Sequence, residues 1–144
     1  MSYEPNNIFA KIIRGEAPAF RVFEDDATVA FMDIMPQADG HTLVVPKAAA
    51  ENLFDIEPQA LARTIVTTQR VARAVKAAFA AEGVMIAQLN GAVAGQSVFH
   101  LHFHILPRHS GIDFRVHARE PAPKDRLEAH AARIREALRS PPPR

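Results

Sequence analysis

The segment that most constrains the fold covers residues 100–106, with the sequence HLHFHIL. Its polar and apolar residues alternate strictly, and a period of two is the pattern of a β-strand with one buried face. We therefore predict a strand over 97–106 with three histidines on one face and apolar side chains on the other. Neighbouring histidines on that face would lie about 6.6 Å apart, because a strand rises roughly 3.3 Å per residue.

Hydrophobic periodicity and turn residues divide the rest of the chain into short elements. Apolar residues at helical spacing predict helices over 7–14, 58–80 and 124–139. Strands are predicted over 20–24, 28–33, 41–45 and 84–90 in addition to 97–106. Because the strands outnumber the helices and several adjoin through short loops, we expect an α+β fold, an antiparallel meander sheet with helices packed on one side. No glycine-rich turn follows the first strand, which argues against a dinucleotide-binding doubly wound sheet.

Composition excludes several classes of function. The formal net charge of the 144 residues is +1, which argues against a nucleic-acid binder that works by neutralising phosphates. The absence of cysteine excludes disulfides, thiolate metal ligands and a cysteine nucleophile. No apolar run approaches the roughly 20 residues of a membrane helix, and residues 1–7 do not resemble a signal peptide. We expect a cytoplasmic protein that binds neither nucleic acid nor membrane.

The three histidines fit three kinds of site. Histidine is the commonest ligand of transition metals, and His41 would be a possible fourth ligand. Neutral imidazole is also a nucleophile, and neighbouring imidazoles can donate protons to phosphate oxygens or to a leaving group. Passive binding of an anion is the third possibility. Without any function, the same pattern would be the solvated face of a half-buried strand.

The loop before the histidines favours phosphate chemistry. Gly91 and Gly95 permit close backbone approach and positive φ, so backbone N–H groups of this loop can form an anion-binding nest. Asn90, Gln96 and Ser97 add side-chain donors. A phosphoryl transition state needs such donors, whereas a metal site does not. Taken alone, the two glycines would equally suit a tight hairpin.

An aspartate and a cluster of apolar residues each fit both a functional and a purely structural interpretation. Asp33 ends a predicted strand and would either accept hydrogen bonds from two ribose hydroxyls or cap the turn. The apolar residues Ile8, Phe9, Ile12 and Phe31 would form either plain core or a pocket for a nucleobase. Their position relative to the histidines decides between these interpretations.

In these residues the chain resembles the histidine triad (HIT) superfamily, and most closely its nucleotide-binding (Hint-like) branch. The resemblance runs from about residue 7 to residue 108. Besides the triad, the segments that carry it are IFAKII at 8–13, GEAP at 15–18, FEDD at 23–26, AFMDI at 30–34, GHTLVVPK at 40–47 and GQS at 95–97. Because these segments occur in one order along the chain, the signal is much more specific than the triad alone.

The resemblance implies a role for each matching residue. His102 would be the nucleophile on the α-phosphorus, and His104 would contact the phosphate and help the leaving group. His100 and His41 would hold the imidazoles in the right tautomers. The donors to the phosphate would be Asn90, Gly95, Gln96 and Ser97. Asp33 would hold the ribose. The base pocket would be formed by Ile8, Phe9, Phe31 and Ile34.

The resemblance therefore implies a homodimeric hydrolase of purine nucleoside 5′-phosphoramidates that forms a covalent nucleotidyl-histidine intermediate and needs no cofactor. A dinucleoside polyphosphate hydrolase, a nucleotide-binding regulatory module and a histidine-based metal-binding protein are the alternatives. Some relatives hold a structural zinc ion with two cysteines and a histidine. The matching positions here are Asn7, Ala10 and Ala49, so no zinc of that type is expected.

The chain extends well beyond the last motif. We expect a HIT domain over residues 1–115, a C-terminal helical extension over 116–139 and a proline-rich disordered tail over 140–144. In Hint-like relatives the C-terminal segment helps to define substrate choice across a dimer, so this extension is expected to affect specificity.

Overall fold

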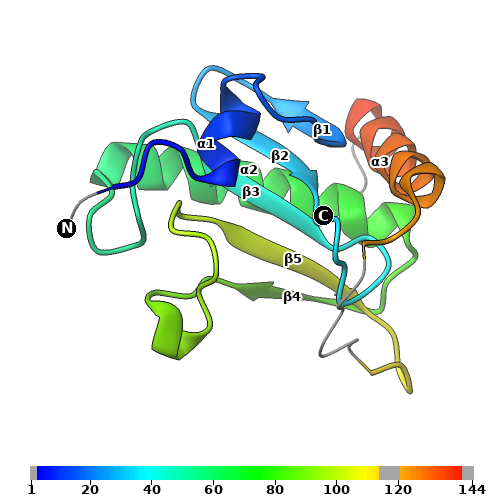
Figure 1. The fold of residues 1–144 in the computed structure, drawn as a ribbon. Coiled ribbons are helices and arrows are strands. Elements are labelled where there is room, and N and C mark those ends of the chain that lie inside the picture. The colour runs from blue at the N-terminus through cyan, green and yellow to red at the C-terminus, as the bar shows by residue number, and fades with distance from the viewer. Residues whose placement is uncertain (1–2, 114–120, 141–144) are drawn as a thin grey trace.

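The computed structural model of the chain describes residues 3–113 and 121–140. Its elements, in chain order and as labelled in Figure 1, are α1 (Ile8–Ile13), β1 (Arg21–Glu24), β2 (Thr28–Met32), β3 (Thr42–Pro46), α2 (Pro58–Ala78), β4 (Gly83–Ala87), the 3₁₀ turn η1 (Ala92–Ala94), β5 (Phe103–Arg108) and α3 (Lys124–Arg139). The three predicted helices are therefore present. No helix within the described ranges is long and apolar enough to cross a membrane.

The five strands form one sheet in the order β1-β2-β3-β5-β4, and every neighbouring pair is antiparallel. The predicted α+β fold with an antiparallel sheet is thus confirmed. The first three strands make the expected meander. After the long α2 crossover, however, the chain enters the sheet at its edge as β4 and returns as β5 beside β3. The strand that ends the histidine segment therefore lies inside the sheet.

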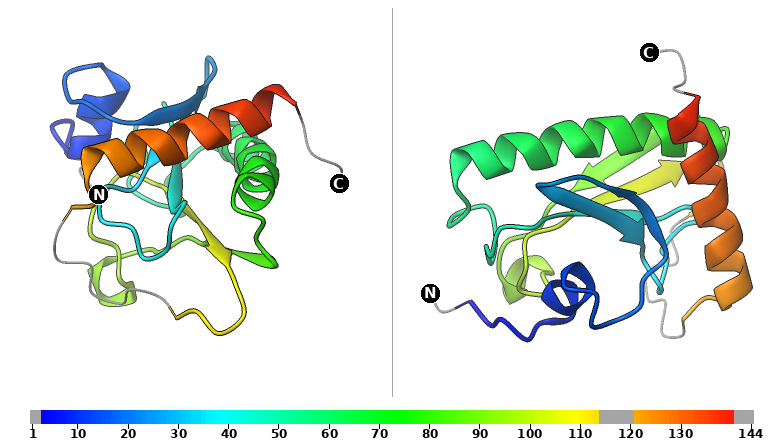
Figure 2. Two further views of the ribbon diagram at one scale, coloured as in Figure 1. Left: turned by 90° about the vertical axis from the view of Figure 1, so that its right-hand side faces the viewer. Right: turned by 90° about the horizontal axis from the view of Figure 1, so that it is seen from above.

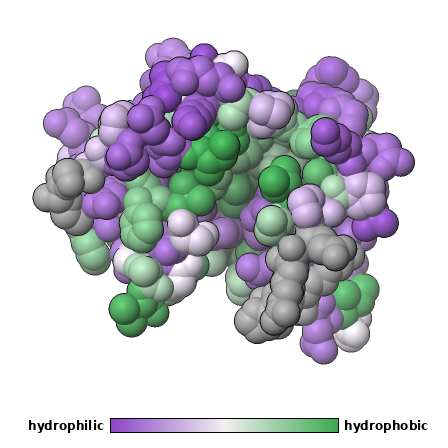
Figure 3. All heavy atoms as spheres, in the orientation of Figure 1, coloured by the Kyte–Doolittle hydropathy of each residue, from purple (hydrophilic) through white to green (hydrophobic). Residues whose placement is uncertain are grey.

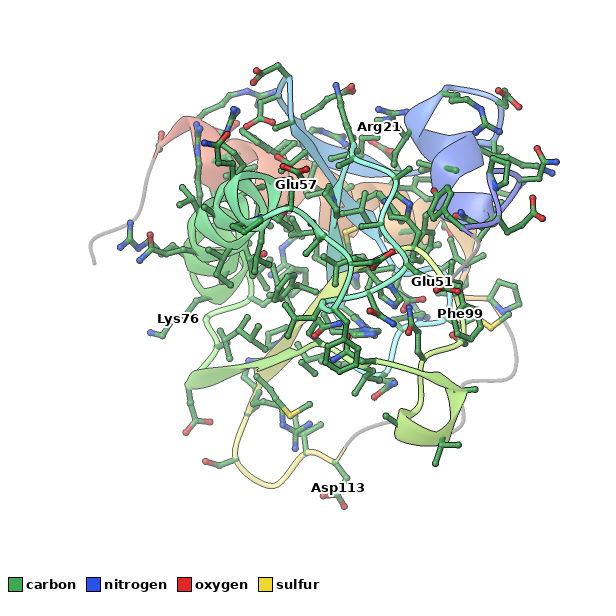
Figure 4. All side chains as sticks on the ribbon, turned by 90° about the vertical axis from the view of Figure 1, so that its left-hand side faces the viewer. Arg21, Glu51, Glu57, Lys76, Phe99 and Asp113 are labelled. Atoms are coloured by element: carbon green, nitrogen blue, oxygen red, sulfur yellow. The ribbon has the colours of Figure 1, made fainter. Side chains whose placement is uncertain are left out.

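The two long helices cover one face of the sheet, as Figure 2 shows. Val71, Ala74 and Val75 of α2 pack there with sheet residues such as Val44 and Ile105. The C-terminal helix α3 adds three buried residues to the same core, Leu127, Ala131 and Ile134. On the outer side of α2, the exposed Lys76 points away from the sheet (Figure 4).

The short helix α1 packs against the opposite face of the sheet, where Phe9 and Ile12 join Phe31, Leu43 and other strand residues. Local signals fix its bounds. The Asn7 side chain accepts a hydrogen bond from the Ala10 N–H at 2.9 Å, and Gly15 follows the helix with a φ of +78°. An Asn cap before the first turn and a left-handed glycine after the last are the usual ends of a helix.

The predicted strand over 97–106 is wrong in its first six residues, because β5 begins only at Phe103. Val44 of β3 pairs with Phe103, so the same register would set Leu101 opposite Pro46. Proline has no N–H to donate to a ladder. The Leu101 N–H instead donates to the carbonyl of Ala50 at 2.9 Å. His100 therefore lies in a bend and His102 in the irregular segment that leads into β5.

Candidate active site

The candidate site lies on the sheet face that carries α1. His104 of β5 pairs with Leu43 of β3 on one side and with Ala87 of β4 on the other. Paired residues of antiparallel strands point to the same face, and Leu43 packs against α1. In the view of Figure 3, apolar side chains gather at the hollowed centre of this face.

A cleft of about 720 Å³ opens there. It brings together nine of the residues expected at the site, namely Ile8, Phe9, Phe31, Asp33, Ile34, Gly95, Ser97, His102 and His104. Further apolar lining residues that were not expected at the site come from β4, from the segment that follows it and from β5, namely Met85, Ala87, Leu89 and Leu106. The sequence of β4, GVMIA, has no polar residue, so no alternation of polar and apolar residues marked Met85 and Ala87.

Backbone carbonyls fix the tautomers of the first two histidines. The His102 Nδ1 atom lies 2.7 Å from the carbonyl oxygen of His100, and His100 Nε2 lies 2.7 Å from that of Pro46. A carbonyl can only accept, so both of these ring nitrogens carry a proton. In neutral rings the other nitrogen of each then has a free lone pair. For His102 that nitrogen is Nε2.

Tyr3 completes the surroundings of His100. Its hydroxyl lies 2.6 Å from His100 Nδ1, which is the nitrogen left to accept a hydrogen bond. No sequence motif contains Tyr3. It is the one tyrosine of the chain, and no spacing rule places it beside a residue 97 positions away.

A second chain of hydrogen bonds runs from the backbone to His104. The Gln37 N–H donates to His41 Nδ1 at 3.1 Å, so the proton of neutral His41 is on Nε2. That nitrogen lies 2.9 Å from His104 Nδ1 and 3.5 Å from an oxygen of Asp33. His104 Nδ1 is therefore an acceptor, and its Nε2 carries the proton. The His102 and His104 rings lie edge to face with centroids 4.9 Å apart.

Burial keeps all four histidines neutral. Desolvation lowers the pKa of His41 to about 3 and that of His104 to about 4, with neighbouring histidines adding to both shifts. Burial also lowers the pKa values of His100 and His102. Neutral rings match the hydrogen bonds described above, in which each ring has one donor and one acceptor nitrogen.

These shifts predict acid destabilisation. The folded histidines bind fewer protons than the unfolded chain below pH 6.5, so the free energy of unfolding should fall as pH decreases from about 6.5 towards 4. Urea unfolding at a series of pH values measures this slope. His102→Ala removes one of the four groups and should make the slope shallower. A slope of zero between pH 7 and pH 5 would contradict the assignment.

Asp33 lies at the rim of this chain of hydrogen bonds. Burial raises the pKa of its carboxyl group to about 6, although the Met35 N–H donates to it at 2.9 Å. An oxygen of this carboxyl group lies 3.5 Å from Nε2 of His41, which the Gln37 N–H holds neutral. A partly buried carboxylate of this kind is well suited to accept hydrogen bonds from a ligand that brings hydroxyl groups.

Two of the expected phosphate donors use their side chains elsewhere. Gln96 is buried and bonds the Gly91 N–H and the carbonyls of Glu51 and Val98. Asn90 accepts from the Leu53 N–H at 2.9 Å and pairs with a neighbouring glutamine. Neither residue lines the cleft. They hold the loop in shape, and the loop then presents Gly95 and Ser97 to the cleft.

A metal ion does not suit the one cluster of suitable ligands found in the described residues. Asp33, His41 and His104 bring one ligand atom each to within 4.8 Å of one another. An ion on His41 Nε2 would displace the proton of that ring to Nδ1. There it would face the Gln37 N–H, and two donors would oppose each other. The hydrogen-bond pattern therefore fits a proton-bearing chain better than a coordination site.

Comparison with known proteins shows the family of the chain. The model of the HIT domain family matches residues 14–111, and the chain therefore belongs to the HIT domain family, a class of nucleotide hydrolases. A HIT-like protein from Bartonella henselae, described as involved in cell-cycle regulation, is 50% identical with a TM-score of 0.89, covering 94% of this chain and 99% of that one.

Of two further relatives, one is named for a bound metal and the other for an enzyme activity. A zinc-bound histidine triad family protein from Mycobacterium smegmatis is 35% identical with a TM-score of 0.82, and 94% of each chain is covered. The adenosine 5′-monophosphoramidase HNT1 of Saccharomyces cerevisiae is 39% identical over 101 residues, which are 70% of this chain and 61% of that protein.

Proposed function

We propose that this protein hydrolyses purine nucleoside 5′-phosphoramidates through a covalent nucleotidyl-His102 intermediate. One observation carries the proposal. The hydrogen bond from His102 Nδ1 to the His100 carbonyl leaves the Nε2 lone pair free in a residue that lines the cleft. The neighbouring His104 carries its proton on Nε2 instead, because its Nδ1 accepts a hydrogen bond from His41. A nucleophile and a proton donor are thus paired.

The two steps balance as follows. The phosphate anion of the bound substrate raises the pKa of the His41–His104 pair, which takes up one proton from solvent. His102 Nε2 then attacks the α-phosphorus while the bond from phosphorus to the leaving nitrogen breaks, and that nitrogen takes the Nε2 proton of His104, which leaves the pair neutral. Water then attacks the phosphorus, the bond to His102 breaks, and the proton of the water returns to His104. Amines leave poorly unless protonated, which is why a general acid belongs beside the nucleophile.

The remaining lining supports a nucleoside monophosphate. Ile8, Phe9, Phe31 and Ile34 form an apolar side next to His102, and the Phe9 ring lies 4.9 Å from its imidazole. This position favours a base pocket over plain core. Asp33 is placed to accept the ribose hydroxyls, and Ser97 to contact the phosphate or the leaving nitrogen.

Charge separates this proposal from a dinucleoside polyphosphate hydrolase. Within residues 3–113 and 121–140, the residues that line the cleft include no lysine and no arginine. Further phosphate groups would then lie in an apolar cleft without a cation, which is costly. An uncharged amine leaving from a single phosphate has no such cost. The name of the yeast relative, adenosine 5′-monophosphoramidase, supports the same substrate class.

Hydrolysis of adenosine 5′-phosphoramidate in the presence of a chelator tests the proposal. We expect turnover with a kcat/KM at least about 100-fold above that for diadenosine triphosphate, since the second nucleotide brings uncompensated charge. Faster hydrolysis of the dinucleotide would favour the polyphosphate hydrolase. Nucleotide binding with negligible turnover of either substrate would favour the regulatory module.

Asp33→Asn should make the protein more stable at pH 7 but weaken its binding of AMP. Native Asp33 keeps its proton up to about pH 6, whereas the unfolded chain loses it near pH 4, so this group lowers stability as pH rises through that window. The amide avoids this cost, and we expect the variant to be about 1–3 kcal/mol more stable at pH 7. Urea unfolding measures the gain, and calorimetry should show weaker binding of AMP. Equal or lower stability at pH 7 would contradict the shifted pKa.

Homodimerisation remains a prediction. β4 is an edge strand with Ile86 43% exposed, and Ile65, Ala72 and Val84 line a groove of about 380 Å³ beside it. Unpaired strand edges with apolar side chains favour association. Light scattering should give twice the 15.8 kDa of one chain, and Ile86→Glu should give a monomer. A native protein that is monomeric at micromolar concentration would contradict this prediction.

A further inference from the structure

The loop over residues 33–41 carries three groups of the candidate site. Asp33 opens it, Gln37 donates its N–H to His41 in the middle, and His41 closes it. The loop connects β2 to β3, but these two strands hold only its ends. What fixes the path between them decides where the Asp33 carboxylate and the His41 ring lie.

At the start of the loop the contact comes from the segment that leads into α3. The Ala122 N–H donates to the carbonyl of Ile34 at 2.8 Å. Ala122 is partly buried against the main core, so this donor is held by packing. The bonded carbonyl belongs to the residue that directly follows Asp33.

The end of the loop lies against the ring of Phe79, the residue that follows α2. A Cβ atom on Gly40 would lie 2.7 Å from the Phe79 ring, so the loop backbone rests on that ring. Gly40 also has a φ of +90°, which side-chain-bearing residues rarely adopt. His41 is the next residue.

The helix α3 holds Phe79 from the other side. The His130 ring meets the Phe79 ring edge to face at a centroid distance of 5.1 Å, and the Arg133 guanidinium lies 4.3 Å above its centre. Arg133 also donates to the carbonyl of Ala78. Contacts of these two kinds add to the burial of an aromatic ring.

We propose that the C-terminal helix α3 is a positioning element of the nucleotide site, which sets the Asp33 carboxylate through Ala122 and the His41 ring through Phe79. This inference rests on the proposed function for the identity of the ligand. Ala122, His130 and Arg133 are positioning residues, because they act through the loop and not on the substrate.

The first test compares AMP with 2′,3′-dideoxy-AMP, which lacks the hydroxyls that Asp33 would hold. Ala122→Pro removes the N–H at a site where Pro123 already restricts the backbone to extended conformations. Loss of one hydrogen bond should weaken AMP binding about fivefold in calorimetry and leave dideoxy-AMP unchanged. Ala122→Ser keeps the N–H and is the control.

The second test needs no ligand. His130→Ala with Arg133→Met releases Phe79, and hydrogen exchange of the Gln37 amide should become at least about five times faster, since that amide depends on the loop. Arg139→Met is the control on the same helix, because Arg139 pairs with the exposed Glu136. Unfolding midpoints show whether each variant remains folded under the conditions of both tests.

The outcomes separate the two proposals. Absence of AMP binding by the native protein would overturn the proposed function and this inference with it. If the native protein binds AMP, the inference alone would be overturned when Ala122→Pro leaves the ratio of the affinities for AMP and dideoxy-AMP unchanged. This holds whether both affinities stay the same or both fall equally. Unchanged Gln37 exchange in the His130/Arg133 variant would overturn the part that concerns Phe79.

Discussion

His102→Ala should lower kcat/KM for adenosine 5′-phosphoramidate at least about 10⁴-fold, because removal of a covalent nucleophile leaves only binding and electrostatic stabilisation. The variant lacks the atom that forms the intermediate, and no other side chain of the cleft has its lone pair in the same place. Steady-state hydrolysis with a chelator present measures the loss. Acid quench of the native protein during turnover should also trap nucleotide on the chain, and the variant should trap none.

A matched variant distinguishes lost chemistry from lost structure. Arg63 lies outside the cleft and pairs with the exposed Asp26, so Arg63→Ala should retain hydrolysis within a few-fold of the native rate. His102→Ala itself should still bind AMP, since the apolar side of the cleft and Asp33 are unchanged. Residual activity of His102→Ala above about one per cent of native would contradict a nucleophilic role.

Ile134→Ala should reduce the free energy of unfolding by about 2–4 kcal/mol, the usual cost of truncating a fully buried isoleucine. Ile134 has no exposed surface, and it packs with residues of α2 and of the sheet in the main core. Its side chain belongs to α3, which lies outside the region matched by the family model. Urea or guanidinium unfolding followed by circular dichroism measures the change.

Leu138→Ala provides the comparison for this loss. Leu138 is on the same helix but only partly buried against the core, so its truncation should cost clearly less than that of Ile134. Equal, small effects of both substitutions would show that α3 is an appendage that unfolds separately. That result would support the predicted division at residue 115 between a domain and an extension.

Much of the fold could be predicted because its signals are local. The Asn7 cap, the glycine that follows α1 and the apolar stripe of the 124–139 segment each depend on a few neighbouring residues. The antiparallel sheet followed from the short loops between strands. The start of β5 could not be predicted in the same way, because it depends on Pro46, a residue far away in the chain that supplies no N–H.

The same distinction applies to the candidate site. Alternation brought His102 and His104 to one cleft, as expected, because their direction is set by the backbone around them. The donor cluster was harder to interpret, since Asn90 and Gln96 have several partners within reach and bond their own loop. Tyr3 and the Gln37 N–H determine tautomers through contacts that no sequence pattern records.

The anchoring of loop 33–41 by α3 has a consequence for the order of synthesis. Lys124 begins α3 after the last strand has ended at Arg108, so a growing chain completes the sheet before the helix that covers it leaves the ribosome. Until then the core face opposite α1 lacks Leu127, Ala131 and Ile134 and exposes apolar surface. We expect a nascent chain of this protein to engage chaperones at that stage, and to acquire nucleotide affinity only once α3 has emerged and docked.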